Sequence, residues 1–117
     1  MKSQRHRKSG FTLVEMLIVV AIIALLAAIA IPNFVHARTS SQRAACIENL
    51  KQLEGAKANW AIERKKSNTD SPTDNQLFGA TRYIRRKPAC PARGIYTIDI
   101  VANQPSCDLG AAEGHTL

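Results

Sequence analysis

Residues 11–32 read FTLVEMLIVVAIIALLAAIAIP, and this stretch decides the fold. Between residues 16 and 31 it contains no polar side chain. At a rise of ~1.5 Å per residue, a helix over residues 11–31 would span roughly 30 Å, which is the thickness of the hydrocarbon core of a bilayer. The pattern therefore predicts one membrane-crossing helix near the N-terminus.

A carboxylate, that of Glu15, lies near the start of this apolar run. An acidic group inside a membrane costs at least ~2.5 kcal/mol and is expected only with a partner, so a cation should meet it. The segment before the run, residues 1–8, is basic: it contains four positively charged side chains and no acidic one, in a chain whose net charge is +7. By the positive-inside rule, this end stays in the cytoplasm and the chain beyond Pro32 lies across the membrane.

Residues 8–17, KSGFTLVEML, strongly resemble the N-terminus of type IV pilins and type II secretion pseudopilins. In that family a basic leader ends in Gly, the chain is cut before Phe, a Glu follows shortly after the cut, and a Pro stands at the position of Pro32. The resemblance implies that a prepilin peptidase cuts between Gly10 and Phe11 and methylates the new amine. It also implies that Glu15 of one subunit pairs with the Phe11 amine of its neighbour, which would fix the register of a filament.

Two other interpretations of the N-terminus stay open. Residues 28–30, Ala-Ile-Ala, have the small-x-small form of a signal-peptidase site, and cleavage there would release a soluble secreted domain. The run could also be a plain anchor, with Glu15 reaching up to the membrane interface. Glu15 counts against both, because neither interpretation supplies a cation for it.

The chain remains helical in pattern from residue 33 to about residue 66 but becomes amphipathic. Four apolar positions are spaced by 4, 3 and 7 residues, which places them on one face of a helix. We expect the C-terminal half of the chain to cover this face. The stripe consists of Cys46, Leu50, Leu53 and Trp60.

Two residues interrupt the regular helix pattern. Pro32 lacks an N–H and its ring clashes with the carbonyl of Ala28, so a kink is expected near residues 28–32. Gly55 lies within the amphipathic part, either because backbones pack closely there or as a tolerated defect that costs roughly 1 kcal/mol.

Residues 67–117 are expected to form a small head. Residues 71–74, Ser-Pro-Thr-Asp, carry a helix start signal, and a second helix should run from there to about Tyr83 or Ile84. Residues 95–101 alternate as a strand, and a turn at residues 103–105 leads to a short last strand around residues 106–109. The predicted fold is α+β and pilin-like: a leader over 1–10, a membrane or filament-core helix over 11–32, its amphipathic continuation over 33–66, and the head over 67–117.

Three cysteines lie in a region expected to face the periplasm, which is oxidising. We expect a Cys90–Cys107 disulfide, which would close a loop of about 17 residues and stabilise the head by roughly 3 kcal/mol. Cys46 lies on the packing stripe and is expected to be a buried hydrophobe, with its pairing left open. A zinc site from the three cysteines and His115 lacks a close ligand pair, so neither a metal nor a cofactor is predicted.

The sequence contains no recognisable catalytic motif, and enzyme activity is not predicted. His36 and His115 lack a nucleophile partner and are expected at the surface. A basic cluster lies at the end of the predicted second helix. It would either complement the dipole at the end of that helix or contact DNA phosphates, as in a DNA-uptake pilin. The cluster consists of Arg82, Arg85, Arg86 and Lys87.

The sequence as a whole predicts a structural subunit of a type II secretion pseudopilus or a type IV pilus-like filament. Its expected partners are copies of itself, other pilins, the prepilin peptidase, an inner-membrane assembly platform and membrane lipid. Before assembly the head should lie in the periplasm. An adhesive or DNA-uptake minor pilin, with nucleic acid as a partner, is the alternative, followed by a secreted soluble domain.

Overall fold

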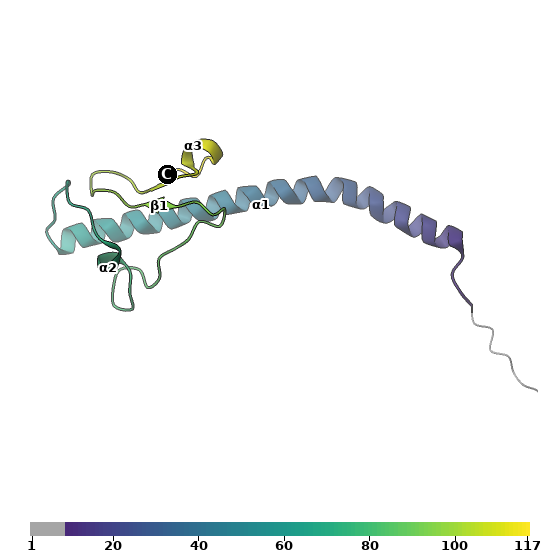
Figure 1. Cartoon of the computed structure of the whole chain (residues 1–117), viewed down its shortest axis with the longest axis horizontal. Helices are drawn as coiled ribbons and strands as arrows, with labels where there is room; N and C mark the ends of the chain where they lie inside the picture. The colour runs from purple at the N-terminus through teal and green to yellow at the C-terminus, as the bar shows by residue number, and fades with distance from the viewer. Residues whose placement is uncertain (1–8) are drawn as a thin grey trace, which may run out of the picture. The chain divides into compact units, whose positions relative to one another are not determined.

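A computed structural model describes residues 9–117, so the predicted leader lies outside the described residues apart from Ser9 and Gly10. The longest element is helix α1, Leu13–Glu63, which confirms the predicted long N-terminal helix (Figure 1). Helical backbone continues through Pro32 without a melted stretch. The kink expected at this proline stays a prediction.

The end of α1 is set by a left-handed residue, Lys65, with φ 51°. The N–H of Lys66 donates to the carbonyl of Ala61 at 2.8 Å, and the N–H of Lys65 donates to that of Ile62 at 3.4 Å. This pair of bonds closes the last turn and satisfies two carbonyls that the helix would leave unpaired. The predicted helix end at residue 66 is therefore slightly too late, because the closing turn occupies those positions.

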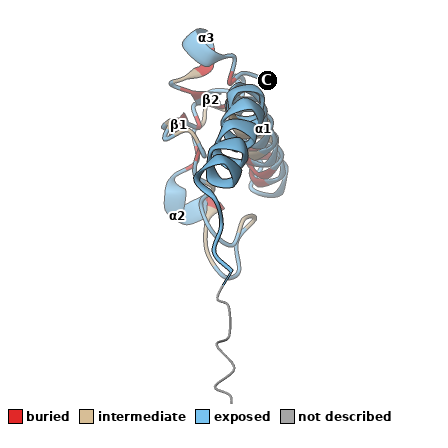
Figure 2. Cartoon of the chain, turned by 90° about the vertical axis from the view of Figure 1, so that its right-hand side faces the viewer, coloured by how far each residue is buried: buried red, intermediate tan, exposed pale blue. Residues whose placement is uncertain are grey.

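One face of the C-terminal half of α1 is buried, as its apolar stripe predicts. Cys46, Leu50 and Leu53 have no exposed surface, and Trp60 is 3% exposed. Figure 2 shows the buried residues where later segments of the chain cover the helix. Burial of a large aliphatic side chain contributes about 1.5–3 kcal/mol, so this stripe is the main apolar contribution of α1 to the head.

A two-stranded hairpin covers part of that stripe. Strand β1, Tyr96–Thr97, pairs antiparallel with β2, Ser106–Cys107, and Tyr96 stands opposite Cys107. Tyr96 and Ile98 are buried while Thr97 between them is exposed, which confirms the predicted alternation. Both strands are shorter than the predicted ranges of 95–101 and 106–109.

A buried lysine, Lys57, explains why the hairpin is short. Its ammonium group donates to the carbonyls of Ile98 and Ile100, each at 2.9 Å, and to that of Asn103. All three ammonium hydrogens are therefore used. These carbonyls turn toward α1 instead of a partner strand, and Asp99 at φ 61° marks the break in the extended backbone.

Helix α2, Asp74–Leu77, is a single turn, so the expectation that it continues to Tyr83 or Ile84 is wrong. Gly79 has φ 150°, which favours glycine, and the chain folds back there. The N–H of Gly79 donates to the carbonyl of Ile84, and the N–H of Ile84 donates to that of Leu77, each at 3.0 Å. Leu77 itself is fully buried against the part of the stripe around Trp60.

A further short helix, α3, Gly110–Glu113, was not predicted. It ends at Gly114, whose φ of 72° is left-handed and favours glycine at a helix C-terminus. This turn reverses the chain, so that the next residue, His115, is buried.

Replacing Lys57 with Met should lower the free energy of unfolding by roughly 2–4 kcal/mol, because three carbonyl oxygens lose their donor at once. The full-length chain in detergent micelles can be unfolded with denaturant and followed by the fluorescence of Trp60. Lys51→Met, at an exposed position of the same helix, is the matched control and should change stability by less than about 0.5 kcal/mol. Equal stability of the two variants would contradict this role of Lys57.

Candidate functional site

The predicted processing bond joins Gly10 to Phe11, directly ahead of α1 (Figure 1). Neither residue is helical, both are exposed, and the side chain of Phe11 is among the most exposed of the apolar residues. Cleavage requires an accessible backbone that is not tied into a helix, and this bond meets that requirement. That a peptidase cuts here stays a prediction.

Glu15 caps its own helix. The N–H of Thr12 donates to Glu15 Oε2 at 2.8 Å, and the N–H of Glu15 donates to Thr12 Oγ1 at 3.2 Å. This reciprocal pair is a capping box, which satisfies two backbone donors at the start of α1. The role of Thr12 is not among the predicted features, although Thr-x-x-Glu before an apolar run is the signal for this motif. Because the cap uses one carboxylate oxygen, Oε2, the other oxygen has lone pairs for a cation from another molecule.

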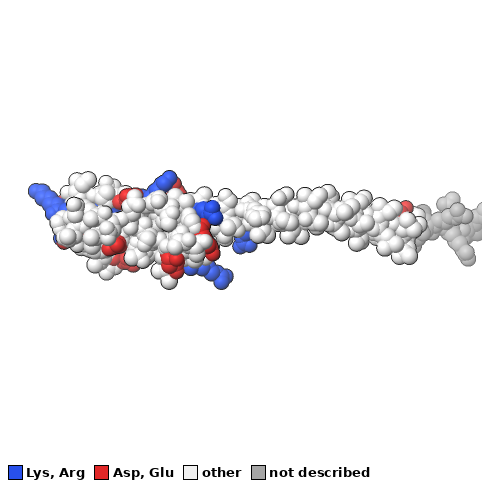
Figure 3. Space-filling model, turned by 90° about the horizontal axis from the view of Figure 1, so that it is seen from above, with Lys and Arg blue, Asp and Glu red and all other residues white. Residues whose placement is uncertain are grey.

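The apolar part of α1 is exposed in the single chain. None of its most apolar 18 residues is buried. By length and composition, α1 is therefore able to cross a membrane. Figure 3 shows this part of the helix almost free of charged side chains. An apolar surface of this extent calls for lipid or protein to cover it. Examples of the exposed side chains are Leu17, Val20, Leu25, Ile29 and Phe34.

The predicted basic cluster lies in the loop after α2. Since α2 ends at Leu77, the explanation of this cluster as a complement to a helix dipole is wrong. Lys87 Nζ forms an ion pair with Asp74 Oδ2 at 2.8 Å and lies 5.7 Å from the centre of the Phe78 ring. One of the four cations therefore has a local partner. The exposed remainder consists of Arg82, Arg85 and Arg86.

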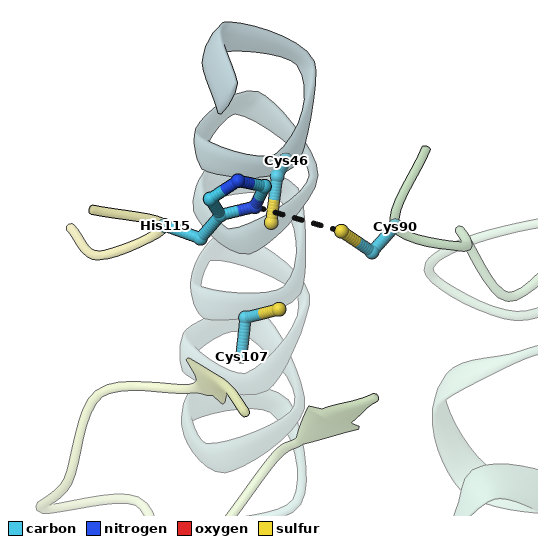
Figure 4. A group of neighbouring side chains, drawn as sticks. All are labelled: Cys46, Cys90, Cys107 and His115. Atoms are coloured by element: carbon cyan, nitrogen blue, oxygen red, sulfur yellow. Dashed lines mark hydrogen bonds between the residues drawn. The ribbon is translucent and has the colours of Figure 1, made fainter. Parts of the chain in front are cut away.

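Four side chains of the C-terminal region converge on one buried position (Figure 4). Cys46 comes from α1, Cys90 from the loop that precedes β1, Cys107 from β2, and His115 from the chain that follows α3. Their sulfur and ring nitrogen atoms all lie within 4.8 Å of one another. His115 is only 1% exposed, so the expectation that it lies at the surface is wrong.

The surroundings of this cluster affect its thiols differently. Burial raises the pKa of the Cys46 thiol and raises that of Cys107 to about 12. Burial would raise the pKa of the Cys90 thiol, but hydrogen bonds from the backbone N–H groups of Ala92 and Gly94 and from the thiols of Cys46 and Cys107 together outweigh it, and this pKa lies below its ordinary value. Cys90 is therefore the thiol of the cluster that ionises most readily.

All three cysteines are free thiols in this structure. Gly94 lies directly against two of them, since a Cβ at this position would collide with Cys107 Sγ and would be 3.2 Å from Cys90 Sγ. The Cys90–Cys107 disulfide stays a prediction. Cys46 is part of the same cluster, so proximity does not single out one pair of cysteines.

Comparison with known proteins agrees with the features of α1. Residues 5–31 match the family described as the prokaryotic N-terminal methylation motif. The chain is 36% identical to the competence protein ComGC of Bacillus subtilis, over 72% of this chain and 82% of that protein. The chain belongs to the type IV pilin and pseudopilin family. This confirms the resemblance that residues 8–17 indicate.

Two further relatives of this pilin-family chain are a type II secretion protein and a type IV pilin. It is 28% identical to the type II secretion system core protein G of Klebsiella pneumoniae, over 74% of this chain and 70% of that protein. It is 48% identical to the type IV major pilin protein PilA of Myxococcus xanthus, over 50% of this chain but only 26% of that pilin. No solved structure matches the chain.

Gly94→Ala should lower the free energy of unfolding by about 1–3 kcal/mol, because the added methyl group would overlap the two sulfur atoms. Gly55→Ala is the matched control. A Cβ at Gly55 meets nothing within 4 Å, and alanine there should raise stability by up to about 1 kcal/mol. Denaturant unfolding of the full-length chain in detergent measures both. A Gly94→Ala chain as stable as the unchanged protein would contradict the close packing around the thiols.

Proposed function

We propose that this chain is a structural subunit of a type II secretion pseudopilus or a closely related type IV pilus-like filament. The observation that carries the proposal is the exposed apolar part of α1, headed by the methylation motif and by Glu15. In this role a prepilin peptidase cuts between Gly10 and Phe11 and methylates the new amine. An inner-membrane platform then assembles the chain with copies of itself or with other pilins. The chain performs no catalysis, and its work is mechanical.

Two environments in turn cover the apolar part of α1. Before assembly it lies in the bilayer, where the basic residues 1–8 hold the N-terminus in the cytoplasm and the head lies in the periplasm. After assembly the same side chains pack against the helices of neighbouring subunits. A helix that is apolar on all sides suits both environments, because it presents no polar face that either would leave unpaired.

Glu15 has two tasks in this proposal. Its Oε2 atom holds the first turn of α1 through the N–H of Thr12. Its other oxygen accepts the methylated amine of Phe11 from a neighbouring subunit. A buried carboxylate without a cation is costly, so only the register that brings the two together is tolerated.

The charge and the cap at Glu15 can be separated by substitution. Glu15→Ala removes both, whereas Glu15→Gln keeps an oxygen that can complete the capping box but loses the charge. If the ion pair with Phe11 sets the register, both variants should reduce the recovery of filaments at least about tenfold. Cleavage after Gly10 should remain largely intact, which intact-mass measurement of the membrane fraction can verify.

Glu48→Gln, an exposed acid in the C-terminal half of α1, is the matched control and should assemble normally. Filaments of Glu15→Gln at the level of the unchanged protein would mean that the cap matters and the ion pair does not. Normal filaments from Glu15→Ala would overturn the role of Glu15 altogether.

A DNA-uptake pilin is the second candidate. It is favoured by the exposed side chains of Arg85 and Arg86 and by the similarity to a protein named for competence. This role predicts DNA binding that falls steeply with salt and is abolished by Arg85→Ala combined with Arg86→Ala. Lys51→Ala combined with Lys65→Ala removes two exposed charges elsewhere and is the control. Absence of DNA binding at low salt would exclude the role.

A further inference from the structure

The buried cluster in the head has the composition of a metal site. Three thiols and one imidazole come from four separate segments of the chain, and their sulfur and nitrogen atoms lie within 4.8 Å of one another (Figure 4). Three cysteines and one histidine form one of the common ligand sets of structural zinc. We infer that Cys46, Cys90, Cys107 and His115 bind one Zn²⁺ ion. The inference is independent of the proposed filament role.

The spacing of the four atoms fits this ion. With Zn–S bonds of ~2.3 Å and a Zn–N bond of ~2.0 Å, tetrahedral geometry places two sulfurs about 3.8 Å apart and a sulfur and a nitrogen about 3.5 Å apart. Cys90 Sγ and His115 Nδ1 are 3.6 Å apart. The largest separation within the cluster, 4.8 Å, exceeds the tetrahedral value by about 1 Å, which small side-chain rotations can remove.

Groups around the cluster suit bound thiolates and a neutral imidazole. The backbone N–H groups of Ala92 and Gly94 donate to Cys90 Sγ, and hydrogen bonds of this kind hold a metal-bound thiolate in place. Glu113 Oε2 lies 3.6 Å from His115 Nε2, on the side of the ring away from Cys90. A carboxylate there favours the tautomer that carries its proton on Nε2 and leaves Nδ1 free for the metal.

A zinc site accounts for more of the cluster than a disulfide does. A disulfide uses two of the three cysteines and does not explain why the third thiol and the buried ring of His115 lie in the same cluster. Binding of Zn²⁺ uses all four groups, and the three thiol protons are released to solvent as the Zn–S bonds form. With four protein ligands the site has no open position, so it is structural and not catalytic.

The fold shows why such a site would matter. The ligands join α1 to the hairpin and to the last residues of the chain, and the strands of the hairpin have only two residues each. A small head with so little regular structure usually needs a covalent or metal crosslink. No two of the four ligands are close in the sequence, so the sequence alone does not indicate a zinc site, and it is the fold that brings the ligands together.

The test uses the full-length protein in detergent micelles, purified without chelators. Elemental analysis should find about one zinc ion per chain, and thiol titration in denaturant with chelator should find three free thiols. Metal-free protein titrated with Co²⁺ should show the absorption of a tetrahedral cobalt–thiolate site. Removal of zinc by a chelator should lower the Tm.

Variants of the histidine separate the zinc site from a disulfide. His115→Ala should lower the affinity for Zn²⁺ at least about 100-fold, while His115→Cys, which supplies a fourth thiolate, should retain the ion even if His115→Ala folds poorly. His36→Ala, an exposed histidine outside the cluster, is the control and should bind zinc normally.

Two results would overturn the inference. One is a protein that binds no zinc when metal-free chains are titrated with Zn²⁺, with a single free thiol and a mass lower by two hydrogens, which would establish a disulfide. The other is full zinc affinity in His115→Ala, which would remove the histidine from the site.

Discussion

Burial of one stripe of α1 is the interaction on which the rest of the C-terminal region depends. Strands of two residues and helices of a single turn do not hold together by themselves. They are held by contact with Leu50, Leu53 and Trp60, and by the carbonyls that Lys57 draws toward the helix. The head is therefore a set of short segments packed on one face of α1, and its core includes that face of the helix (Figure 2).

The two halves of α1 differ in how their apolar side chains are covered. Its second half hides an apolar stripe within its own chain, while its first half exposes apolar side chains in nearly every direction. The first half is therefore complete only in a bilayer or among other helices. The capping box between Thr12 and Glu15 closes the end of this helix and also holds the carboxylate at a defined place, where another subunit can meet it.

Local sequence patterns predicted the parts of the fold that depend on neighbouring residues. The apolar run, the stripe spaced by 4, 3 and 7 residues, and the alternation around Tyr96 were sufficient for α1 and for the existence of the hairpin. The roles of Lys57 and His115 depend on segments more than twenty residues away, so no local pattern marks them. Helix α2 is shorter than predicted because Phe78 is already extended, with φ −110° and ψ 137°, although the start signal of the helix is clear. Thr12 was missed despite a visible motif.

The filament role requires that α1 is synthesised as part of a prepilin and is neither a plain anchor nor a secretion signal. The most direct measurement is the intact mass and N-terminal sequence of the mature protein isolated from the cells that make it. The filament role predicts a chain that begins at Phe11 and carries one added methyl group on its amine. A chain that begins at Ile31, or one that retains Met1, would contradict it.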